Sequence, residues 1–497
     1  MEMVTIGLEP LGKTIRVRKG SPLKDALHEY GVEFPCGGKG TCGKCRVRLL
    51  RGAINTDDFH RKRLAELGLG GEWRLACLSL CHTDMVIGVD QYETLIQADE
   101  TPFEFVPRKG LGVAVDLGTT TLVAQLLDLQ QGRILAMEKG LNPQQKFGSD
   151  LISRLEAALS GNAPEMTGII RKKIGEMIGR MTAGRKEDPE RIILVGNTVM
   201  QHFFCGFDLK PLSFYPFESP LLGAARFLPV ELGWDLLSRE VVFYPSIGSF
   251  VGSDILAGIQ ATGICEGEEY SLLIDLGTNG EIVLGNRSRL LCASTAAGPA
   301  FEGARISMGM LATTGAISSL ESGPAGWNIK VIGNGSPRGI CGSGLIDAVA
   351  VLLGRGLLDE YGQLVGAGEQ VTLAGPVVLT QKDIQEFQLA KAAIATGVEI
   401  LMKKLSIGPG DIATVHIAGA FGSYLNMDSV TATGMLGFTP VAFRKLGNTA
   451  LMGAKMFLFS DLSLTDAILE RTSHVNLESD PSFQDLFVEN MRFRPGP

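Results

Sequence analysis

One strand–turn–strand frame occurs twice in the chain, and this repeat restricts the available folds more than any other feature. VAVDLGTTTLVAQLLDL at 113–129 and LLIDLGTNGEIVLGN at 272–286 each place the turn Asp-Leu-Gly-Thr between two apolar strands. The copies are too far apart for a solenoid repeat. From residue 111 onward, apolar strands also alternate with helical stretches, which is typical of α/β folds. The sequence therefore predicts a duplicated α/β domain whose two halves face a common cleft.

Both turns have the chemistry of a phosphate-binding loop. Glycine permits a tight turn, and the residues after it present backbone N–H and side-chain polar groups to an anion. The aspartate before each glycine, Asp116 or Asp275, is placed to hold Mg²⁺ through water or to orient an attacking water. The predicted loop residues are Gly118, Thr119, Thr120, Thr121, Gly277, Thr278 and Asn279. Two such loops facing each other are expected to clamp a polyphosphate and its metal.

Two further glycine-rich segments favour nucleotide contacts. In HIAGAFGSYL, Gly419, Ala420 and Gly422 would let an adenine lie flat against the backbone. In GICGSGLIDAVA, Gly342 and Ser343 open a helix and are candidates for the ribose or phosphate side. One glycine-rich turn is a weak signal, so the prediction of a nucleotide site depends on their combination with the duplicated turns.

The sequence leaves the role of two carboxylates open. Asp254 in FVGSDILAG fits a helix N-cap, and it equally fits a catalytic group near a γ-phosphate, beside Asp116 and Asp275. Glu302 in AGPAFEGA has the same two interpretations.

Cysteine spacing predicts an iron–sulfur module at the N-terminus. The loop CGGKGTCGKC supplies Cys36, Cys42 and Cys45, and RLAC supplies Cys77. A [2Fe–2S] cluster needs four thiolates, and plant-type ferredoxins take three from one loop and one from a distant position. Cys81 is an alternative fourth ligand. A zinc site is the competing interpretation, although zinc ribbons usually show two paired-cysteine knuckles and this region has one.

Length and charge set the expected organisation. A chain of 497 residues suggests three domains, and a net charge of −8 argues against a nucleic-acid partner. We expect a domain at 1–92, a linker at 93–110 and two halves of a body at 111–267 and 268–497. No long uncharged apolar stretch and no secretory signal is visible, so we expect no membrane span and a cytoplasmic location.

Each part of the chain resembles a known family. The cysteine loop resembles [2Fe–2S] ferredoxins, which implies an α+β ferredoxin-like (β-grasp) domain. The remainder resembles the actin, Hsp70 and sugar-kinase (ASKHA) superfamily, which implies a duplicated α/β ATPase body that binds ATP with Mg²⁺. Its five signature elements match 116–121, 194–204, 275–280, 416–425 and 446–456.

The whole chain resembles the reductive activators of corrinoid-dependent enzymes. NPQQKFGSDLISR, GNTVMQHF, AGPAFEGARI and IAGAFG are similar to phrases of that family. The resemblance implies an ATP-driven electron transfer from the [2Fe–2S] cluster to the cob(II)alamin of a corrinoid protein in a methyltransferase or O-demethylase system. It also implies an external low-potential electron donor, and a homodimer through the ATPase body is left open. No cysteine follows Cys341, so the subtype with a cysteine-rich tail is excluded.

Other classes remain open at this stage. An activator of 2-hydroxyacyl-CoA dehydratases shares the ATPase body but has its cluster cysteines inside that body and lacks a ferredoxin domain. A small-molecule kinase with a redox-sensing ferredoxin domain, an activator of another low-potential enzyme and a redox-responsive regulator are the further alternatives.

Overall fold

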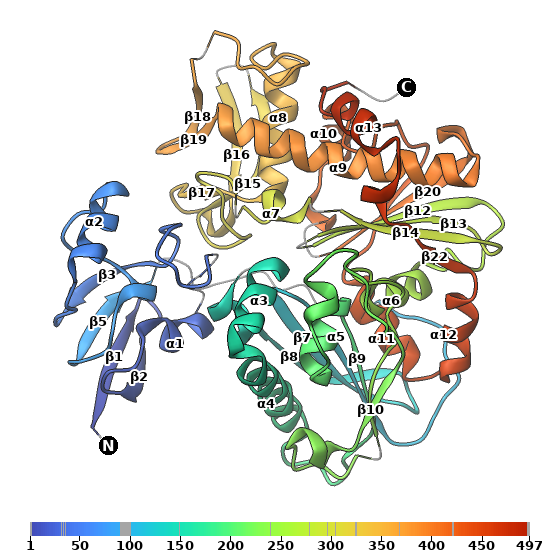
Figure 1. Ribbon diagram of the computed structural model, residues 1–497, viewed down its shortest axis with the longest axis horizontal. Helices are drawn as coiled ribbons and strands as arrows, with labels where there is room; N and C mark the ends of the chain where they lie inside the picture. Colours follow the sequence, from blue (N-terminus) through green and yellow to red (C-terminus); the bar gives the residue numbers. More distant parts are fainter. Residues whose placement is uncertain are drawn as a thin grey trace.

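The computed structural model describes residues 2–494 except 31, 33, 35, 90–100, 149, 239, 278, 296, 304, 324–325, 367 and 420–421. Figure 1 shows a small N-terminal domain beside two larger lobes that lie one above the other. Among the described residues, no helix has the length and apolar character needed to cross a membrane.

The N-terminal domain is a five-stranded mixed sheet with the strand order β2-β1-β5-β3-β4. Its elements are β1 (Met3–Glu9), β2 (Lys13–Arg18), α1 (Leu23–Leu27), β3 (Arg46–Arg51), α2 (Asp58–Glu66), β4 (Trp73–Leu75) and β5 (Met85–Gly88). β1 pairs antiparallel with β2 and parallel with β5. Val4, Ile6 and Leu8 alternate along β1 and are buried, because every second side chain of a strand faces the core. The predicted β-grasp order is therefore confirmed.

The body contains two six-stranded sheets with the same central order. The first sheet, in lobe I, runs β10-β11-β9-β6-β7-β8, and the second, in lobe II, runs β21-β20-β12-β13-β14-β22. The lobe I strands are β6 (Leu111–Leu117), β7 (Thr121–Asp128), β8 (Arg133–Leu141), β9 (Pro189–Val195), β10 (Ala225–Phe227) and β11 (Glu240–Phe243). The lobe II strands are β12 (Tyr270–Leu276), β13 (Gly280–Gly285), β14 (Leu290–Thr295), β20 (Ile412–Ala418), β21 (Phe443–Lys445) and β22 (Thr472–His474).

Corresponding strands also pair in the same way. β6 and β12 each have a parallel neighbour on one side, β9 or β20, and an antiparallel hairpin partner on the other, β7 or β13. Each Asp-Leu-Gly-Thr turn connects the two strands of such a hairpin. The predicted duplication of an α/β unit is therefore confirmed.

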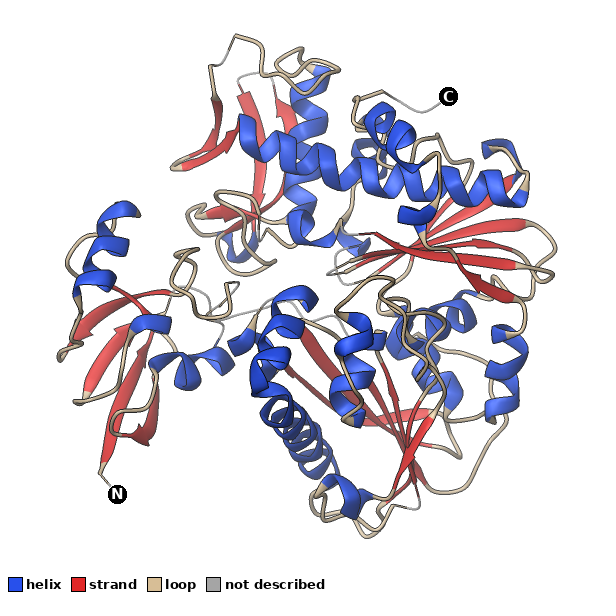
Figure 2. Cartoon of the chain, in the orientation of Figure 1, coloured by secondary structure: helices blue, strands red, loops and turns tan. Residues whose placement is uncertain are grey.

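Helices cover the sheets, as Figure 2 shows. The helices of the body are α3 (Leu151–Ala157), α4 (Ala163–Thr182), α5 (Thr198–Cys205), α6 (Ser253–Thr262), α7 (Gly298–Phe301), α8 (Gly342–Gly354), α9 (Gln381–Leu405), α10 (Met427–Ala432), α11 (Thr449–Phe457), α12 (Leu462–Leu469) and α13 (Phe483–Asn490). Lobe II also carries the small strands β15 (Ala316–Gly323), β16 (Gly326–Val331), β17 (Gly339–Ile340), β18 (Gln370–Ala374) and β19 (Val377–Thr380).

Helices α6 and α11 lie between the two sheets and share one apolar cluster with both of them. Gly453 of α11 faces α6 so closely that a Cβ atom there would lie 2.1 Å from the backbone oxygen of Ala257. Glycine is therefore required at this crossing. Tyr244, directly after β11 in lobe I, stacks on Phe457 of α11 with ring centroids 4.6 Å apart. The two lobes therefore meet through these helices.

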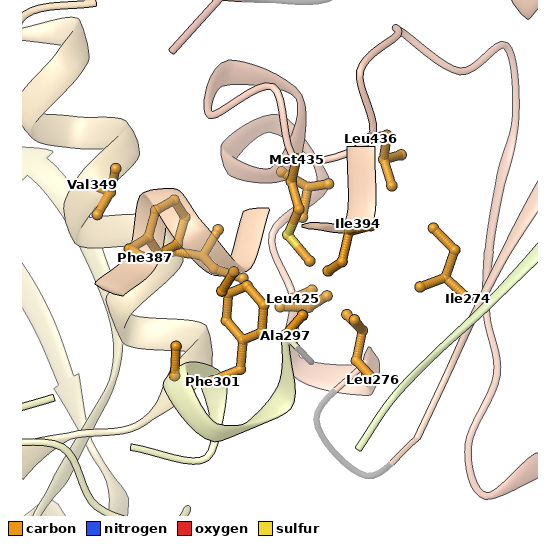
Figure 3. Packing of buried hydrophobic residues seen from close by; sticks show 14 of the residues in the cluster. Ile274, Leu276, Ala297, Phe301, Val349, Phe387, Ile394, Leu425, Met435 and Leu436 are labelled. Carbon is orange, nitrogen blue, oxygen red and sulfur yellow. The ribbon is translucent and has the colours of Figure 1, made fainter. Parts of the chain in front are cut away.

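The core of lobe II packs α8 and α9 against its sheet (Figure 3). Phe301 and Phe387 meet edge to face with centroids 5.8 Å apart. Both rings are buried, and burying a phenylalanine side chain stabilises a fold by about 1.5–3 kcal/mol. This packing gives the lobe II wall of the cleft a rigid support.

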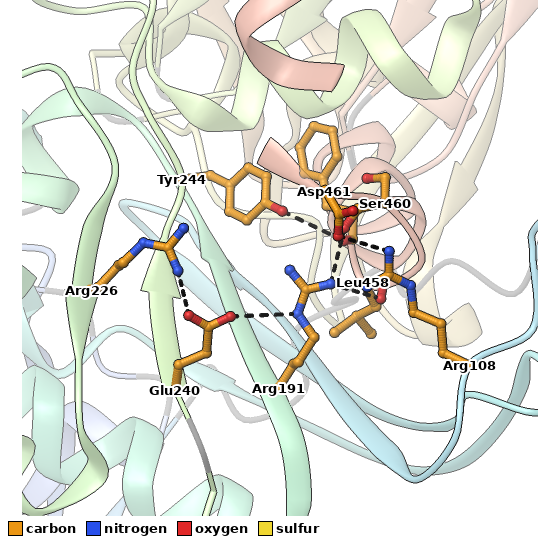
Figure 4. A network of polar contacts seen from close by, with 9 residues as sticks. Arg108, Arg191, Arg226, Glu240, Tyr244, Leu458, Ser460 and Asp461 are labelled. Atoms are coloured by element: carbon orange, nitrogen blue, oxygen red, sulfur yellow. Dashed lines mark hydrogen bonds and ion pairs between the residues drawn. The ribbon is translucent and has the colours of Figure 1, made fainter. Parts of the chain in front are cut away.

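A polar network attaches the start of the body to the turn between α11 and α12 (Figure 4). Arg108 Nη2 donates to Asp461 Oδ1 at 2.8 Å, and Arg191 Nη1 donates to the backbone oxygen of Ser460 at 3.0 Å. The hydrogen bond and positive charge of Arg108 lower the pKa of Asp461. Nearby, Phe105 contacts Phe459 with centroids 4.5 Å apart. The second part of the predicted linker, 101–110, is thus packed on the body, while residues 93–100 lie outside the described residues.

Candidate functional site

A cleft of about 270 Å³ lies between the two lobes and brings most of the predicted nucleotide residues together. Those that line it are Asp116, Gly118, Thr119, Thr120, Thr121, Asp254, Asp275, Gly277, Asn279, Gly342, Ser343 and Gly419. They come from both halves of the duplication, as a clamp between two facing loops requires.

Three predicted residues are not among the cleft residues. Thr278 and Ala420 lie outside the described part of the chain. Gly422 does not line the cleft and packs against its own strand, since a Cβ atom there would lie 2.8 Å from Ile417 Cγ2. Tyr424, two residues further on, lines the cleft instead.

The two predicted phosphate loops are both tight turns, and the turn in lobe I is one residue longer than the turn in lobe II. The backbone N–H of Gly118 donates to the backbone oxygen of Thr121 at 3.0 Å, and that of Gly277 donates to the backbone oxygen of Asn279 at 3.0 Å. A Cβ atom on Gly118 would lie 2.7 Å from the same Thr121 oxygen, so only glycine fits. Each loop joins two strands of its sheet, which fixes its position at the edge of the cleft.

Four carboxyl groups of the cleft have raised pKa values. Burial is the largest cause for each, and neighbouring aspartates add to it in Asp254, Asp275 and Glu281. The pKa rises to about 6 for Asp116, to about 7 for Asp275 and to about 8 for Asp254, and Glu281 is also raised. In Asp116 a hydrogen bond from Asn448 opposes the rise. Acidic groups held so close together favour a bound cation, which compensates their negative charge.

Magnesium fits this donor set. Mg²⁺ is usually held by one or two carboxylates, with water and phosphate oxygens completing its shell. In the described residues, no group of three His, Cys, Asp or Glu side chains is arranged to hold one metal ion.

The N-cap interpretation of Asp254 is wrong. Helix α6 is capped by Gly252, without any side-chain bond, and Asp254 lies in the first turn. Its Oδ1 accepts from the backbone N–H of Ile255 at 2.9 Å while the residue lines the cleft. Glu302 also lines the cleft, where Thr120 Oγ1 donates to its Oε1 at 3.4 Å from the opposite lobe. Both carboxylates face the space between the lobes.

Two asparagines of the cleft were not predicted. Asn197 caps α5 and donates from Nδ2 to Thr119 Oγ1 at 2.9 Å. Asn448 caps α11 and donates from Nδ2 to Asp116 Oδ2 at 2.7 Å. Both stand in the tripeptide Gly-Asn-Thr, at 196–198 and 447–449, so this second internal repeat is the sequence signal that could have identified them.

The four cysteines of the N-terminal loop form two pairs. Cys42 Sγ donates to Cys36 Sγ at 3.5 Å, and Cys45 Sγ donates to Cys77 Sγ at 3.2 Å. These hydrogen bonds lower the pKa of Cys36 to about 4 and lower that of Cys77, whereas they raise the pKa of the donor thiols Cys42 and Cys45. Each pair thus holds one thiol that favours the thiolate form, which binds metals. Two pairs of thiols suit two irons with two cysteine ligands each better than a single zinc.

Cys81 lies apart from these pairs. It is fully buried in the hydrophobic core of the N-terminal domain, and burial raises the pKa of its thiol to about 11. Its backbone N–H donates to the backbone oxygen of Ser21. Cys81 therefore has the surroundings of a structural cysteine.

A second cavity, of about 650 Å³, adjoins the cysteine loop. Cys36 and Cys42 line it together with Leu151 of lobe I and Val475 of lobe II. Asn279 lines both this cavity and the nucleotide cleft. The cavity beside the cysteine loop and the nucleotide cleft therefore meet at Asn279.

The fold and the two sites define a class of protein in which a [2Fe–2S] ferredoxin-type domain is fused to a two-lobed ATP-binding body of the ASKHA type. Three family models match in this order: a 2Fe-2S iron-sulfur cluster binding domain at 6–82, the RACo middle region at 111–266, and the C-terminal ASKHA domain of RACo at 269–495.

Relatives match over most of the chain. The corrinoid activation enzyme RamQ of Eubacterium limosum is 33% identical over 83% of this chain and 77% of its own length. A [Co(II) methylated amine-specific corrinoid protein] reductase of Methanosarcina barkeri is 28% identical over 72% and 71%. A solved reductive activator for corrinoid, iron-sulfur protein has a TM-score of 0.67 and 26% identity, covering 99% of this chain and 98% of its own. The chain belongs to the RACo family.

Proposed function

We propose that this protein is an ATP-dependent reductive activator of a corrinoid protein. It takes one electron from a donor and passes it to cob(II)alamin in the partner, which becomes cob(I)alamin. The observation that carries the proposal is that the four-cysteine site contacts the two-lobed nucleotide body within one chain. Lys39 of the cysteine loop pairs with Glu156 of lobe I at 3.0 Å, and Lys44 donates to the backbone oxygen of Gly309 in lobe II at 2.7 Å.

The residues divide the work between the two sites. The turns at Gly118 and Gly277 bind the phosphates, and Asp116 and Asp275 hold Mg²⁺ or orient the attacking water. A [2Fe–2S] cluster held by the four paired cysteines supplies one-electron transfer. This transfer takes place beside the cavity that Cys36 and Cys42 line.

ATP has a purpose only if the electron transfer is unfavourable without it. For a one-electron step, each gap of about 59 mV changes the equilibrium tenfold, which corresponds to about 1.4 kcal/mol. ATP hydrolysis covers a gap of several such steps. A plain ferredoxin with a more reducing cluster would need no nucleotide cleft, so the fused body supports an acceptor that is harder to reduce than the cluster.

The test is an anaerobic absorption experiment with a corrinoid protein in the cob(II) state. With reductant, cluster-loaded protein and Mg-ATP, the cob(I)alamin spectrum should appear, and it should not appear when ATP is left out. The rate of ATP hydrolysis should also rise when the cob(II) partner is added. Equal cob(I)alamin formation without nucleotide would show a simple ferredoxin reductant. Phosphorylation of a supplied alcohol, without cobalt reduction, would show a kinase.

Three finer points belong to the same proposal. The electron comes from an external low-potential donor, and the basic excess of the N-terminal domain favours an acidic partner at that step. The protein acts in the cytoplasm. Two copies form a homodimer through the body, which light scattering at several concentrations tests.

A further inference from the structure

The cysteine loop lies directly on a short segment of lobe I, residues 142–148. This segment contains the 3₁₀ helix η3 (Pro143–Phe147). A Cβ atom on Gly37 would lie 2.6 Å from the backbone oxygen of Phe147 and 3.9 Å from Gly148 Cα. The loop and the segment are therefore in backbone contact, and the Lys39–Glu156 ion pair lies beside this contact.

The same segment is tied to the phosphate loop of lobe I. The backbone N–H of Asn142 donates to the backbone oxygen of Thr120 at 2.9 Å, and Gln145 Nε2 donates to that same oxygen at 3.0 Å. Asn142 Nδ2 also donates to the backbone oxygen of Gly118 at 2.9 Å. Asn142 is fully buried and Gln145 nearly so. A shift of the peptide groups at 118–120 must therefore move or break the bonds that hold the segment.

The cysteine loop has a second attachment on the other lobe. Lys44 Nζ donates to the backbone oxygen of Gly309 in lobe II, while Lys39 pairs with Glu156 in lobe I. A rotation of one lobe against the other changes the distance between these two attachment points, and closure over a ligand is the usual motion of a two-lobed cleft. The loop that carries both lysines cannot follow both lobes at once.

We propose that Asn142 and Gln145 are positioning residues through which nucleotide binding at the phosphate loop releases the cysteine loop from the body. Without nucleotide, the loop is docked on 142–148 and attached to both lobes. When phosphates bind at 118–121 and the lobes close, the segment moves with Thr120 and the docking contact opens. This inference rests on the proposed function at one point only: the proposed function identifies the corrinoid protein as the partner that the released loop contacts.

The energetics allow such a release. The Lys39–Glu156 pair is exposed on both sides, and exposed ion pairs contribute little to the free energy of association. Gln145, by contrast, makes a buried bond to the site of ligand binding. A ligand shifts an equilibrium only if its affinity differs between the two states. Because Gln145 bonds to Thr120, the phosphate loop differs between the state with the cysteine loop docked and the state with it released.

Hydrogen exchange of the cluster-loaded protein, measured under anaerobic conditions by mass spectrometry, tests the proposal. The probe is Mg²⁺ with a non-hydrolysable ATP analogue at saturation, and its affinity is measured for every variant. In the wild type, exchange at residues 36–45 should rise about fivefold with nucleotide, the low end of usual allosteric coupling. Gln145→Leu removes one of the three bonds between the segment and the phosphate loop, so this rise should fall well below the wild-type value although the analogue still binds.

Gln144→Leu is the matched control. Gln144 is a fully buried neighbour in the same segment, but its Nε2 donates to the backbone oxygen of Met166 in α4 and not to the phosphate loop. It should keep the nucleotide response. Glu156→Gln, on the surface of the body, removes only an exposed ion pair and should keep the nucleotide response. The wild-type response to nucleotide tests the proposal even if the Gln145 variant does not fold.

The outcomes separate the two proposals. The inference is overturned if wild-type exchange at 36–45 is unchanged by saturating nucleotide, or if Gln145→Leu responds as the wild type does. A normal exchange response together with no reduction of cob(II)alamin would contradict the proposed function and leave the coupling intact. Full ATP-dependent reduction of cob(II)alamin without any exchange response would support the proposed function and overturn the coupling.

Discussion

Asn448 donates from Nδ2 to Asp116 Oδ2 at 2.7 Å, although the two residues are 332 positions apart in the sequence. The Oδ1 atom of the same side chain accepts from the backbone N–H of Leu451 at 2.8 Å and so caps helix α11. One side chain therefore sets both the start of an inter-lobe helix and the orientation of a carboxylate in the cleft. Asn197 has the corresponding role at the other site: it caps α5 and donates to Thr119 Oγ1.

Replacing Asn448 should separate these two effects. Asn448→Ala removes both bonds, so it should cost about 1 kcal/mol of stability through the lost cap. It should also lower the ATPase rate about tenfold to a hundredfold, because Asp116 loses its orientation. Asn448→Ser keeps a capping oxygen and loses the amide donor to Asp116, so it should reduce hydrolysis with little loss of stability. A wild-type ATPase rate in Asn448→Ser would show that the bond to Asp116 has no role in hydrolysis.

Asp116→Asn and Asp275→Asn should each lower ATP hydrolysis by about a hundredfold or more, because a carboxylate that binds Mg²⁺ or orients water becomes a neutral amide. The visible absorption of the cluster should stay unchanged, since both residues lie in the body. Glu176→Gln on the surface of α4 is the control and should hydrolyse ATP normally. If both aspartate variants keep the wild-type rate, the phosphate clamp lies elsewhere.

Local sequence patterns were enough for much of the fold. The alternation of Ile15 and Val17 with polar residues marks a strand with one face toward the core, and the repeated Asp-Leu-Gly-Thr turn marks two equivalent hairpins. Both signals are short in range: a period of two along one strand, and a glycine that must leave room for a neighbouring backbone oxygen. Such requirements are visible in a few consecutive residues, so one sequence suffices to find them.

Features that depend on long-range packing were not found. The bond between Asn448 and Asp116 needs α11 to lie against lobe I, and no local pattern states which lobe a C-terminal helix joins. The contact between Gly37 and Phe147 likewise depends on how two domains dock. Asp254 was ambiguous because an acidic residue at a helix start serves as a cap or as a cleft residue equally well. Only the position of Gly252 as the cap decided between them.

His416 on β20 should make the body less stable as the pH falls. It is 5% exposed, and burial, assisted by the charge of Arg444, lowers its pKa from 6.5 to about 4. Between these values the unfolded chain binds a proton that the folded chain does not, so the free energy of unfolding decreases with falling pH. At pH 5 the loss should reach about 2 kcal/mol, at about 1.4 kcal/mol per pH unit.

Urea unfolding of the wild type and of His416→Gln at several pH values measures this effect. At pH 8 both side chains are neutral, so the difference between the two proteins reports packing alone. As the pH falls to 5, the variant should gain relative to the wild type. A difference that stays constant from pH 8 to pH 5 would show that His416 has no such role.

Cys77→Ser and Cys81→Ser form a matched pair that tests the fourth cluster ligand. The Cys77 thiol lies 3.2 Å from that of Cys45, whereas Cys81 is buried in the apolar core and has no place in either thiol pair. Cys77→Ser should therefore lose the visible absorption and the rhombic EPR signal of the reduced cluster, and its iron content should fall well below two atoms per chain. Cys81→Ser should keep the absorption, the EPR signal and the iron content. It should instead lower the free energy of unfolding by about 1–3 kcal/mol, because the serine hydroxyl is buried without a hydrogen-bond partner. Loss of the cluster in Cys81→Ser with retention in Cys77→Ser would reverse the assignment, and stoichiometric zinc in a colourless wild-type protein would refute the cluster itself.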